Sequence, residues 1–327
     1  MRKRTGFSIR ELMKTSPLSF LIWLMLITSQ IIFATKYAGD FEEMGVSARA
    51  IGLGGACVAV VNDASAIYYN PAAGAKTNAR SILLMHCESF GGAVKSNYLG
   101  ILVPNQNQSY GIAILHNGVP KIKLTTLPDT TQPPSDTNQP ILEREVNANQ
   151  FVFYLNFGQS LSPALHIGVN AKMIYQTYGV ASCFGMGIDF GSVITFFDSL
   201  DLGLRIRNLT TSPLFWDTKT REVISPHPAL GIARRFTIGQ DRLLLSVELE
   251  SNLDEGLTNW QLLENIGVEY SLKRILSARI GLYHQLFTFG LGAEFRGFFV
   301  DYAYQTGYFS QARDLGSSQR ISGGLKF

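Results

Sequence analysis

The chain has 327 residues and a formal net charge of +3; 16% of its residues are charged and 46% are hydrophobic. Its basic residues are scattered, so it lacks the electrostatic footprint of a nucleic-acid-binding protein. Its three cysteines (Cys57, Cys87 and Cys183) have no C-x-x-C spacing. This argues against a disulfide framework or a zinc site, and allows one disulfide between any two of them. We expect neither a metal nor a cofactor.

Residues 1–34 have the pattern of a secretory signal peptide. Arg2-Lys3-Arg4 precedes an apolar core from Ser19 to Ala34, and Ala34 is small enough for cleavage directly after it. Ile32, at the −3 position, is not small, which leaves an uncleaved signal anchor as the alternative. The polar residues 35–44 are expected to form a periplasmic lead-in.

Residues 45–74 form a stretch rich in Gly and Ala with few charges. Its glycines allow close backbone approach or positive φ. The segment Asn62–Ser65 offers N-cap chemistry for a helical turn over Ala66–Tyr69, and Pro71 ends that turn. Cys57–Val61 has the composition of a short strand. A dinucleotide fingerprint fails, because Cys57 stands where the third glycine of G-x-G-x-x-G would lie.

Residues 80–327 contain recurrent short segments in which apolar and polar residues alternate with the period of a β-strand. The clearest is Leu200–Arg207, whose even positions are apolar. We predict about fourteen strands, near residues 80–88, 96–104, 107–117, 145–158, 163–178, 182–196, 200–209, 226–237, 241–251, 261–271, 275–285, 287–296, 297–306 and 318–327.

This alternation fits either a soluble β-sandwich or propeller, or a membrane barrel whose apolar face meets lipid. Two features favour the barrel. The non-apolar positions are often Gly or charged residues of both signs, which suits a polar interior around a plug. The segments also reach the roughly 9 to 11 residues that a membrane strand needs. After residue 35 no stretch is long and apolar enough for a transmembrane helix.

The sequence therefore predicts an all-β, antiparallel transmembrane barrel of about fourteen strands in the bacterial outer membrane. Residues 80–327 form the barrel, whose first and last strands pair, and residues 35–79 form the lead-in and a hatch inside it. The predicted hatch motif comprises Gly52, Gly54, Gly55, Asp63, Asn70, Pro71 and Ala72.

Three longer connections, residues 118–144, 210–226 and 307–317, are predicted at the outer face. Residues 118–144 contain five prolines and are expected to have little regular structure. The aromatic residues of the other two connections form either a partner surface or an aromatic girdle at the membrane interface. They are Phe215, Trp216, Tyr308 and Phe309.

The last strand alternates up to the terminal Phe327. A terminal Phe on such a strand resembles the signal by which outer-membrane barrels are recognised by their insertion machinery. We therefore expect that machinery and outer-membrane lipid as partners.

The N-terminal stretch resembles the signature of PorV/PorQ-type proteins, which belong to the long-chain fatty acid transporter (FadL-like) barrel group. It reads G-x-S-A-R-A-x-G-x-G-G-A over Gly45–Ala56 and D-A-S-A-x-Y-x-N-P-A over Asp63–Ala72. Tyr69 departs from this pattern, because the family often has Trp there. The resemblance implies a fourteen-stranded barrel with an internal hatch.

The resemblance implies two non-enzymatic functions. PorV-type members act in type IX secretion, where they bind cargo proteins at the outer surface, and this is the main prediction. FadL-like members take up hydrophobic small molecules past a hatch, which is the alternative. The uptake function predicts an apolar pocket beside the hatch, lined by a set of tyrosines. The alternative is that these tyrosines only pack the hatch against the barrel. These residues are Tyr68, Tyr69, Tyr98, Tyr154 and Tyr283.

An outer-membrane lipase or protease is the remaining class. Such an enzyme needs a nucleophile, a base and an orienting group together. The five histidines occur in neither a G-x-S-x-G nor an H-E-x-x-H context. The sequence therefore predicts no catalytic residues.

Overall fold

The computed structural model describes residues 38–197, 199–253, 261–307 and 317–327, which all belong to one compact unit. The predicted signal peptide, residues 1–34, lies outside the described residues, as do Tyr308 and Phe309. No helix in the described part of the chain is long and apolar enough to cross a membrane.

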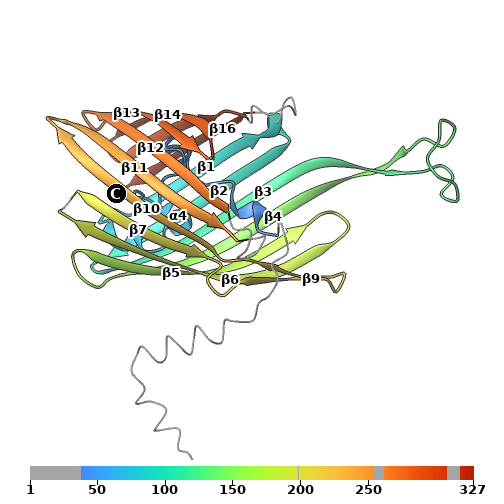
Figure 1. Ribbon diagram of the computed structural model, residues 1–327, viewed down its shortest axis with the longest axis horizontal. Helices are drawn as coiled ribbons and strands as arrows, with labels where there is room; N and C mark the ends of the chain where they lie inside the picture. The colour runs from blue at the N-terminus through green and yellow to red at the C-terminus, as the bar shows by residue number, and fades with distance from the viewer. Residues whose placement is uncertain (1–37, 198, 254–260, 308–316) are drawn as a thin grey trace, which may run out of the picture. The chain divides into compact units, whose positions relative to one another are not determined.

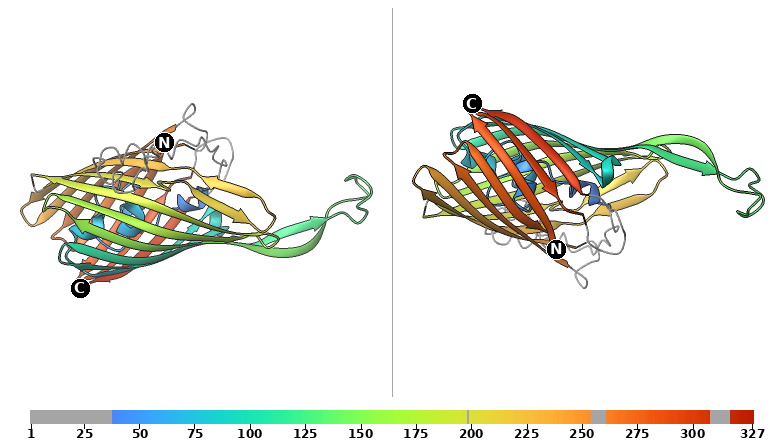
Figure 2. Two further views of the ribbon diagram at one scale, coloured as in Figure 1. Left: turned by 90° about the horizontal axis from the view of Figure 1, so that it is seen from below. Right: turned by 90° about the horizontal axis from the view of Figure 1, so that it is seen from above.

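Fourteen antiparallel strands form a closed ring (Figures 1 and 2). Each strand pairs with its neighbours in the chain, with β7 next to β10. The ring consists of β1 (Ser81–Ser89), β2 (Val94–Asn105), β3 (Gln108–Thr126), β4 (Ile141–Ser160), β5 (Leu165–Thr177), β6 (Ser182–Phe196), β7 (Leu200–Arg207), β10 (His227–Ile238), β11 (Asp241–Asn252), β12 (Gln261–Leu272), β13 (Leu276–Tyr283), β14 (Leu286–Phe295), β15 (Phe298–Gln305) and β16 (Ser318–Lys326).

The first and last strands close the barrel. β1 pairs with β16 in continuous antiparallel register from Ser81↔Lys326 to Glu88↔Gln319. The predicted fourteen-stranded antiparallel barrel is therefore confirmed. Closure removes both sheet edges, and this is the condition under which strands can lie in lipid.

The two faces of the barrel wall have the polarity of a membrane barrel. Outward side chains are large, apolar and exposed, as at Leu84 (57% exposed) and Leu291 (64% exposed). Inward side chains include charged groups that are almost fully buried, such as Arg205 and Glu248. A soluble sandwich would show the reverse, so the soluble alternative does not fit.

The two ends of the barrel differ. Tight connections join β2–β3, β4–β5, β6–β7, β10–β11, β12–β13 and β14–β15 at one end, which we call the short-turn end. The long β3–β4 and β7–β10 connections lie at the opposite end, which we call the loop end. Short turns face the periplasm and long loops face outward in bacterial outer-membrane barrels.

The β3–β4 hairpin is longer than predicted and projects beyond the other strands (Figure 1). Residues 118–144 were expected to lack regular structure, but β3 continues to Thr126 and β4 begins at Ile141. Pro120 is tolerated because it sits at a register shift between Val119 and Ile122, where β3 no longer pairs with β2. The remaining prolines all lie in the loop beyond.

Residues 210–226 are also more regular than expected. They contain β8 (Ser212–Trp216) and β9 (Arg221–Ile224), and β8 pairs with the start of β6. Leu214 and Ile224 are buried in the same hydrophobic cluster as the hatch. This hairpin therefore packs against the contents of the barrel at its loop end.

The N-terminal segment lies inside the barrel as short helical pieces. These are η1 (Asp40–Glu42), α3 (Ala48–Gly52), α4 (Ala66–Tyr69) and η2 (Ala73–Lys76); a further turn, η3 (Phe90–Gly92), joins β1 to β2. The helical turn predicted at Ala66–Tyr69 is present. The strand predicted at Cys57–Val61 is wrong, because the N–H groups of Cys57 and Val58 are bound by a wall carboxylate, Glu248, rather than by a strand.

Residues 38–44 differ from the expected periplasmic lead-in. Phe41 and Glu42 are buried, and the Phe41 carbonyl accepts a hydrogen bond from Asn117 on β3. Gly39 lies against Ile224 of β9, near the loop end. Its carboxylate, Glu42, pairs with Lys172 on β5, so the segment lies in the lumen.

Substituting Gly281→Val should displace the hatch. A side chain at this inward position of β13 would overlap the backbone of Gly54, at a cost of about 1–3 kcal/mol. The reporter is Cys57, in a variant whose other cysteines are replaced by Ser. Cys57 is buried, and burial and Glu248 raise the pKa of its thiol, so a closed hatch protects it from alkylation.

We expect faster alkylation of Cys57 in Gly281→Val, with the heat-modifiable gel mobility of a folded barrel retained. Gly323→Val is the matched control, because a Cβ there would meet no atom closer than 3.4 Å. Equal alkylation of the two variants would contradict the close approach of hatch and wall.

Candidate functional site

The predicted Asn70-Pro71-Ala72 turn is buried against one side of the wall, which the neighbouring strands β4, β5 and β6 form. The buried Asn70 side chain donates from Nδ2 to the carbonyls of Val58 (2.7 Å) and of Ser192 on β6 (3.1 Å). Its Oδ1 accepts the N–H of Ala72 (3.1 Å). Asn156 on β4 donates to the Pro71 carbonyl (3.1 Å). These bonds hold the hatch where it leads into the barrel.

The three hatch glycines lie against the opposite wall. Gly54 and Gly55 have φ of +63° and +76°, a conformation that favours Gly. The Gly54 N–H donates to Thr288 on β14 (3.1 Å). Gly52 meets Gly290 of the same strand so closely that a Cβ on either would lie 3.0 Å from the Cα of the other. Glycine on both sides lets two backbones touch here.

Asp63 has a local role. Its Oδ1 accepts hydrogen bonds from the Ser65 N–H (2.8 Å) and hydroxyl (2.6 Å), just ahead of α4. The carboxylate therefore orders the chain that enters this helical turn.

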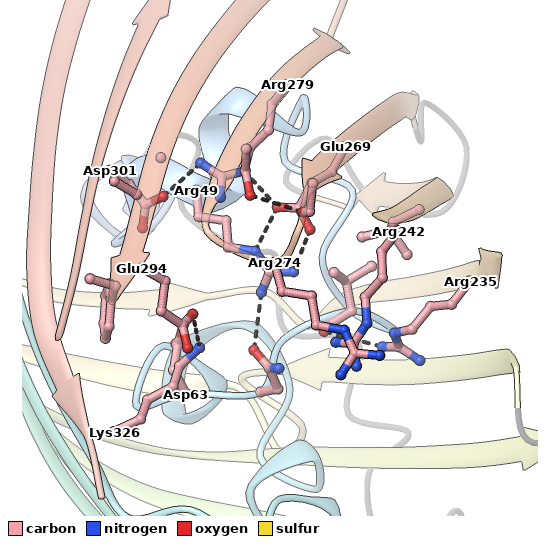
Figure 3. A pocket seen from close by; sticks show the side chains of 18 of the residues that line it. Arg49, Asp63, Arg235, Arg242, Glu269, Arg274, Arg279, Glu294, Asp301 and Lys326 are labelled. Atoms are coloured by element: carbon pink, nitrogen blue, oxygen red, sulfur yellow. Dashed lines mark hydrogen bonds and ion pairs between the residues drawn. The ribbon is translucent and has the colours of Figure 1, made fainter. Parts of the chain in front are cut away.

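Hatch and wall are joined near the short-turn end by a chain of ion pairs (Figure 3). Arg49 of α3 donates two hydrogen bonds to Glu269 of β12, at 2.9 and 3.0 Å. Arg279 of β13 donates to the same carboxylate (2.6 Å) and to Asp301 of β15 (2.6 Å). Two arginines and two carboxylates thus compensate one another across three strands and the hatch.

A second charged set lies nearer the loop end. Lys172 pairs with Glu42 of the lead-in (2.6 Å) and with Asp189 of β6 (3.1 Å). Arg205 of β7 pairs with Glu250 of β11 (2.8 Å). All five side chains are buried, so each would be costly without its partners.

Two of the predicted tyrosines belong to the hatch, and three reach it from the wall. Tyr68 donates to the Glu42 carbonyl, and the Tyr69 hydroxyl accepts the Val46 N–H. Burial raises the pKa of both hydroxyls, so both stay neutral. From the wall, Tyr98 of β2 donates to the Ala64 carbonyl (2.8 Å), Tyr283 of β13 donates to the Glu43 carbonyl (3.3 Å), and Tyr154 of β4 is buried.

The cavity beside Tyr68, Tyr69 and Tyr283 measures about 20 Å³, which is room for one water molecule. The geometry of these rings is therefore that of packing between hatch and wall. Their role as walls of a ligand pocket stays a prediction that requires the hatch to move.

Two of the predicted loop aromatics, Phe215 and Trp216, lie within the described residues, on β8. The Trp216 indole donates to Glu222 (2.9 Å) and stacks on Tyr178. Phe215 is 45% exposed. The two neighbours point to opposite faces of β8, because Trp216 also packs against the buried cluster. Their role as a partner surface stays a prediction.

A pocket of about 340 Å³ at the short-turn end was not predicted (Figure 3). Arg49 and Asp63 of the hatch line it together with Arg235, Arg242 and Arg274 of the wall. Strand alternation places Arg235 and Arg242 on the inward face, but it does not show that two neighbouring strands and a turn aim arginines at one point. The described residues contain no group of His, Cys, Asp and Glu side chains arranged to hold a metal ion.

All three cysteines are free and buried in the structure. Cys57 lies in the hatch, whereas Cys87 and Cys183 lie on β1 and β6. No disulfide therefore links the hatch to the wall.

No family model and no curated protein match the chain. Solved structures do. They include the Pseudomonas putida toluene transporter TodX (11% identity, 86% of this chain and 97% of that chain covered, TM-score 0.56). The Ralstonia pickettii toluene transporter TbuX (10%, 86% and 97%, 0.54) and the monoaromatic hydrocarbon channel CymD (10%, 86% and 96%, 0.54) match similarly.

At such low identity this likeness shows a shared fold. It supports the FadL-like barrel architecture to which the sequence resemblance points. The PorV/PorQ-type subgroup stays a prediction.

Replacing Arg49→Gln or Glu269→Gln should loosen the hatch. Each change leaves a largely buried charge with one partner fewer, which we expect to cost about 2–3 kcal/mol. Hydrogen exchange of residues 45–61 should then be roughly 30-fold faster or more. Glu294→Gln breaks the more exposed pair with Lys326 and should cost less than about 1 kcal/mol. Equal exchange in all three variants would show that the Arg49–Glu269 pair does not hold the hatch.

Proposed function

We propose that this chain is an outer-membrane channel for small hydrophobic molecules, gated by movement of the hatch. One observation carries the proposal: the N-terminal segment fills a closed fourteen-stranded barrel with an apolar exterior. Structures with this fold include proteins described as toluene transporters and a monoaromatic hydrocarbon channel. The short-turn end would face the periplasm.

The hatch has to move for passage, because its contacts reach around the wall. Asn70 is bound to β6, Gly54 to β14, and Cys57 to β11. Most of these contacts are single hydrogen bonds or close backbone approaches. Charged contacts link Arg49, Glu42 and Lys76 of this segment to the wall. Release of these anchors is the step that we infer for opening.

A type IX secretion-associated role stays the other prediction. It rests on the PorV/PorQ-type sequence resemblance and would use exposed loop-end aromatics such as Phe215. Binding of secretion-system proteins, and of the insertion machinery through Phe327, also stays a prediction. Purification from native membranes separates the two functions, since a large translocon partner supports secretion.

Uptake of [¹⁴C]toluene by cells that express the protein and lack other hydrocarbon channels should exceed that of empty-vector cells. Uptake of a charged solute of similar size, benzoate, should not rise, because a path for hydrophobic molecules would have to take its carboxylate out of water, which is costly. Toluene uptake equal to the empty-vector level, with the barrel present and folded in the outer membrane, would overturn the proposal.

Locking the hatch should block that uptake. A Cβ at Gly231 of β10 would lie 3.4 Å from the Cβ of Val58, close to the spacing of a disulfide. The double variant Val58→Cys/Gly231→Cys is made with Cys57→Ala, so that the neighbouring thiol does not compete. We expect no uptake when it is oxidised and recovery after reduction.

Each single cysteine variant serves as a control for the substitution itself. Unchanged uptake in the fully cross-linked double variant would show that passage does not require this part of the hatch to leave β10.

A further inference from the structure

Three arginines converge at the short-turn end, beside the hatch (Figure 3). Arg235 and Arg242 are inward residues of the paired strands β10 and β11, and the register Thr237↔Arg242 makes them diagonal neighbours on one face. Arg274 reaches the same pocket from the β12–β13 turn, where its φ is +58°. Arg274 and Arg235 both repel the charge of Arg242, and Glu294 attracts it.

The protein compensates the charge of this arginine cluster only in part. Arg235 shares Asp201 with Lys76. Arg242 and Arg274 make no hydrogen bond or ion pair with any residue that the structure describes. Arg242 and Arg274 are exposed, so water screens part of their repulsion. Like charges placed together with too few counter-charges still favour an anion.

The other charges of the pocket leave a positive excess. Its carboxylates are already engaged: Glu269 and Asp301 by arginines, Glu294 by Lys326, and Asp63 by Ser65. Six cationic side chains line the pocket against these four carboxylates, an excess of two charges. The cationic side chains are Arg49, Arg235, Arg242, Arg274, Arg279 and Lys326.

We propose that this pocket binds a phosphate monoester. Guanidinium groups match phosphate oxygens in a two-pronged geometry. A phosphate monoester carries about −1.5 to −2 charges near pH 7, which balances the excess of two, whereas a carboxylate would leave one cation unpaired. The pocket volume of about 340 Å³ exceeds what a phosphate needs. Leu244 and Phe299 also line it, so the ester group has apolar surface to contact.

Such an ester has two sources at this end of the barrel. It is either a small soluble ester in the periplasm or a lipid that carries a terminal phosphate, such as phosphatidate. The proposal does not rest on the proposed transport, because the site requires only the arginines and the closed hatch.

Binding of phenyl phosphate to the purified full-length protein, in an uncharged detergent, tests the soluble source by calorimetry. We expect saturable one-to-one binding and no comparable binding of benzoate. Arg242→Gln and Arg274→Gln should each weaken it at least about tenfold. The affinity of Arg242→Lys should lie between those of Arg242→Gln and the unaltered protein, since lysine keeps the charge but lacks the two-pronged guanidinium group. Arg296→Gln, a turn arginine at the same end outside the pocket, should bind as the unaltered protein does.

Native mass spectrometry from bilayers of phosphatidylcholine with phosphatidate tests the lipid source. If the unaltered protein retains phosphatidate, Arg242→Gln and Arg274→Gln lose it, and phenyl phosphate does not bind, the site is supported with a lipid as its ligand. Binding of neither probe, equal binding of benzoate, or binding unchanged in both glutamine variants overturns the proposal. Heat-modifiable mobility confirms that each variant is folded, and toluene uptake reports the transport proposal separately.

Discussion

The pairing of β1 with β16 is the constraint from which the rest of this structure follows. In lipid, every backbone N–H and C=O of a spanning strand needs a partner within the protein, and only a closed sheet meets this need with strands. Once the ring is closed, the outward face has to be apolar. The polar half of each strand is then confined to the lumen, where charges such as Arg205 and Glu248 lie buried. Those charges need partners, and the hatch provides part of them.

The barrel could be predicted from the sequence because strand alternation is a local property. Each strand such as Leu200–Arg207 carries its own two faces, whatever it pairs with. The regular structure within residues 118–144 and 210–226 could not be predicted in this way. The β3–β4 arm extends past its outer neighbours, and β8 depends on a free stretch of β6 near Cys183. Both pairings depend on which strands the folded chain brings side by side. The prolines of residues 118–144 indicated only where strand pairing stops.

The hatch was predictable in composition but not in its contacts. Glycines and the Asn-Pro pair mark a segment that packs closely, and the structure places Gly54 and Asn70 against opposite walls. Cys57–Val61 was misassigned because Glu248, which binds its backbone, lies some 190 residues away in the sequence. The tyrosines were considered as pocket walls on their ring character. All but Tyr154 instead form hydrogen bonds through their hydroxyls to backbone groups of residues 42–64, which only the folded chain brings near.

The two ends of the lumen carry different electrostatics, and this bears on how the hatch can open. At the loop end Glu42 is compensated by Lys172, and the pair is buried. At the short-turn end Arg49 is compensated by Glu269 but faces a pocket with excess positive charge. An anion in that pocket lies in the field of the Arg49–Glu269 link, so its binding and the position of the hatch share one set of charges. Coupling between anion binding and hatch opening is reciprocal. If the bound anion changes the equilibrium constant for hatch opening by some factor, opening of the hatch must change the affinity for the anion by the same factor.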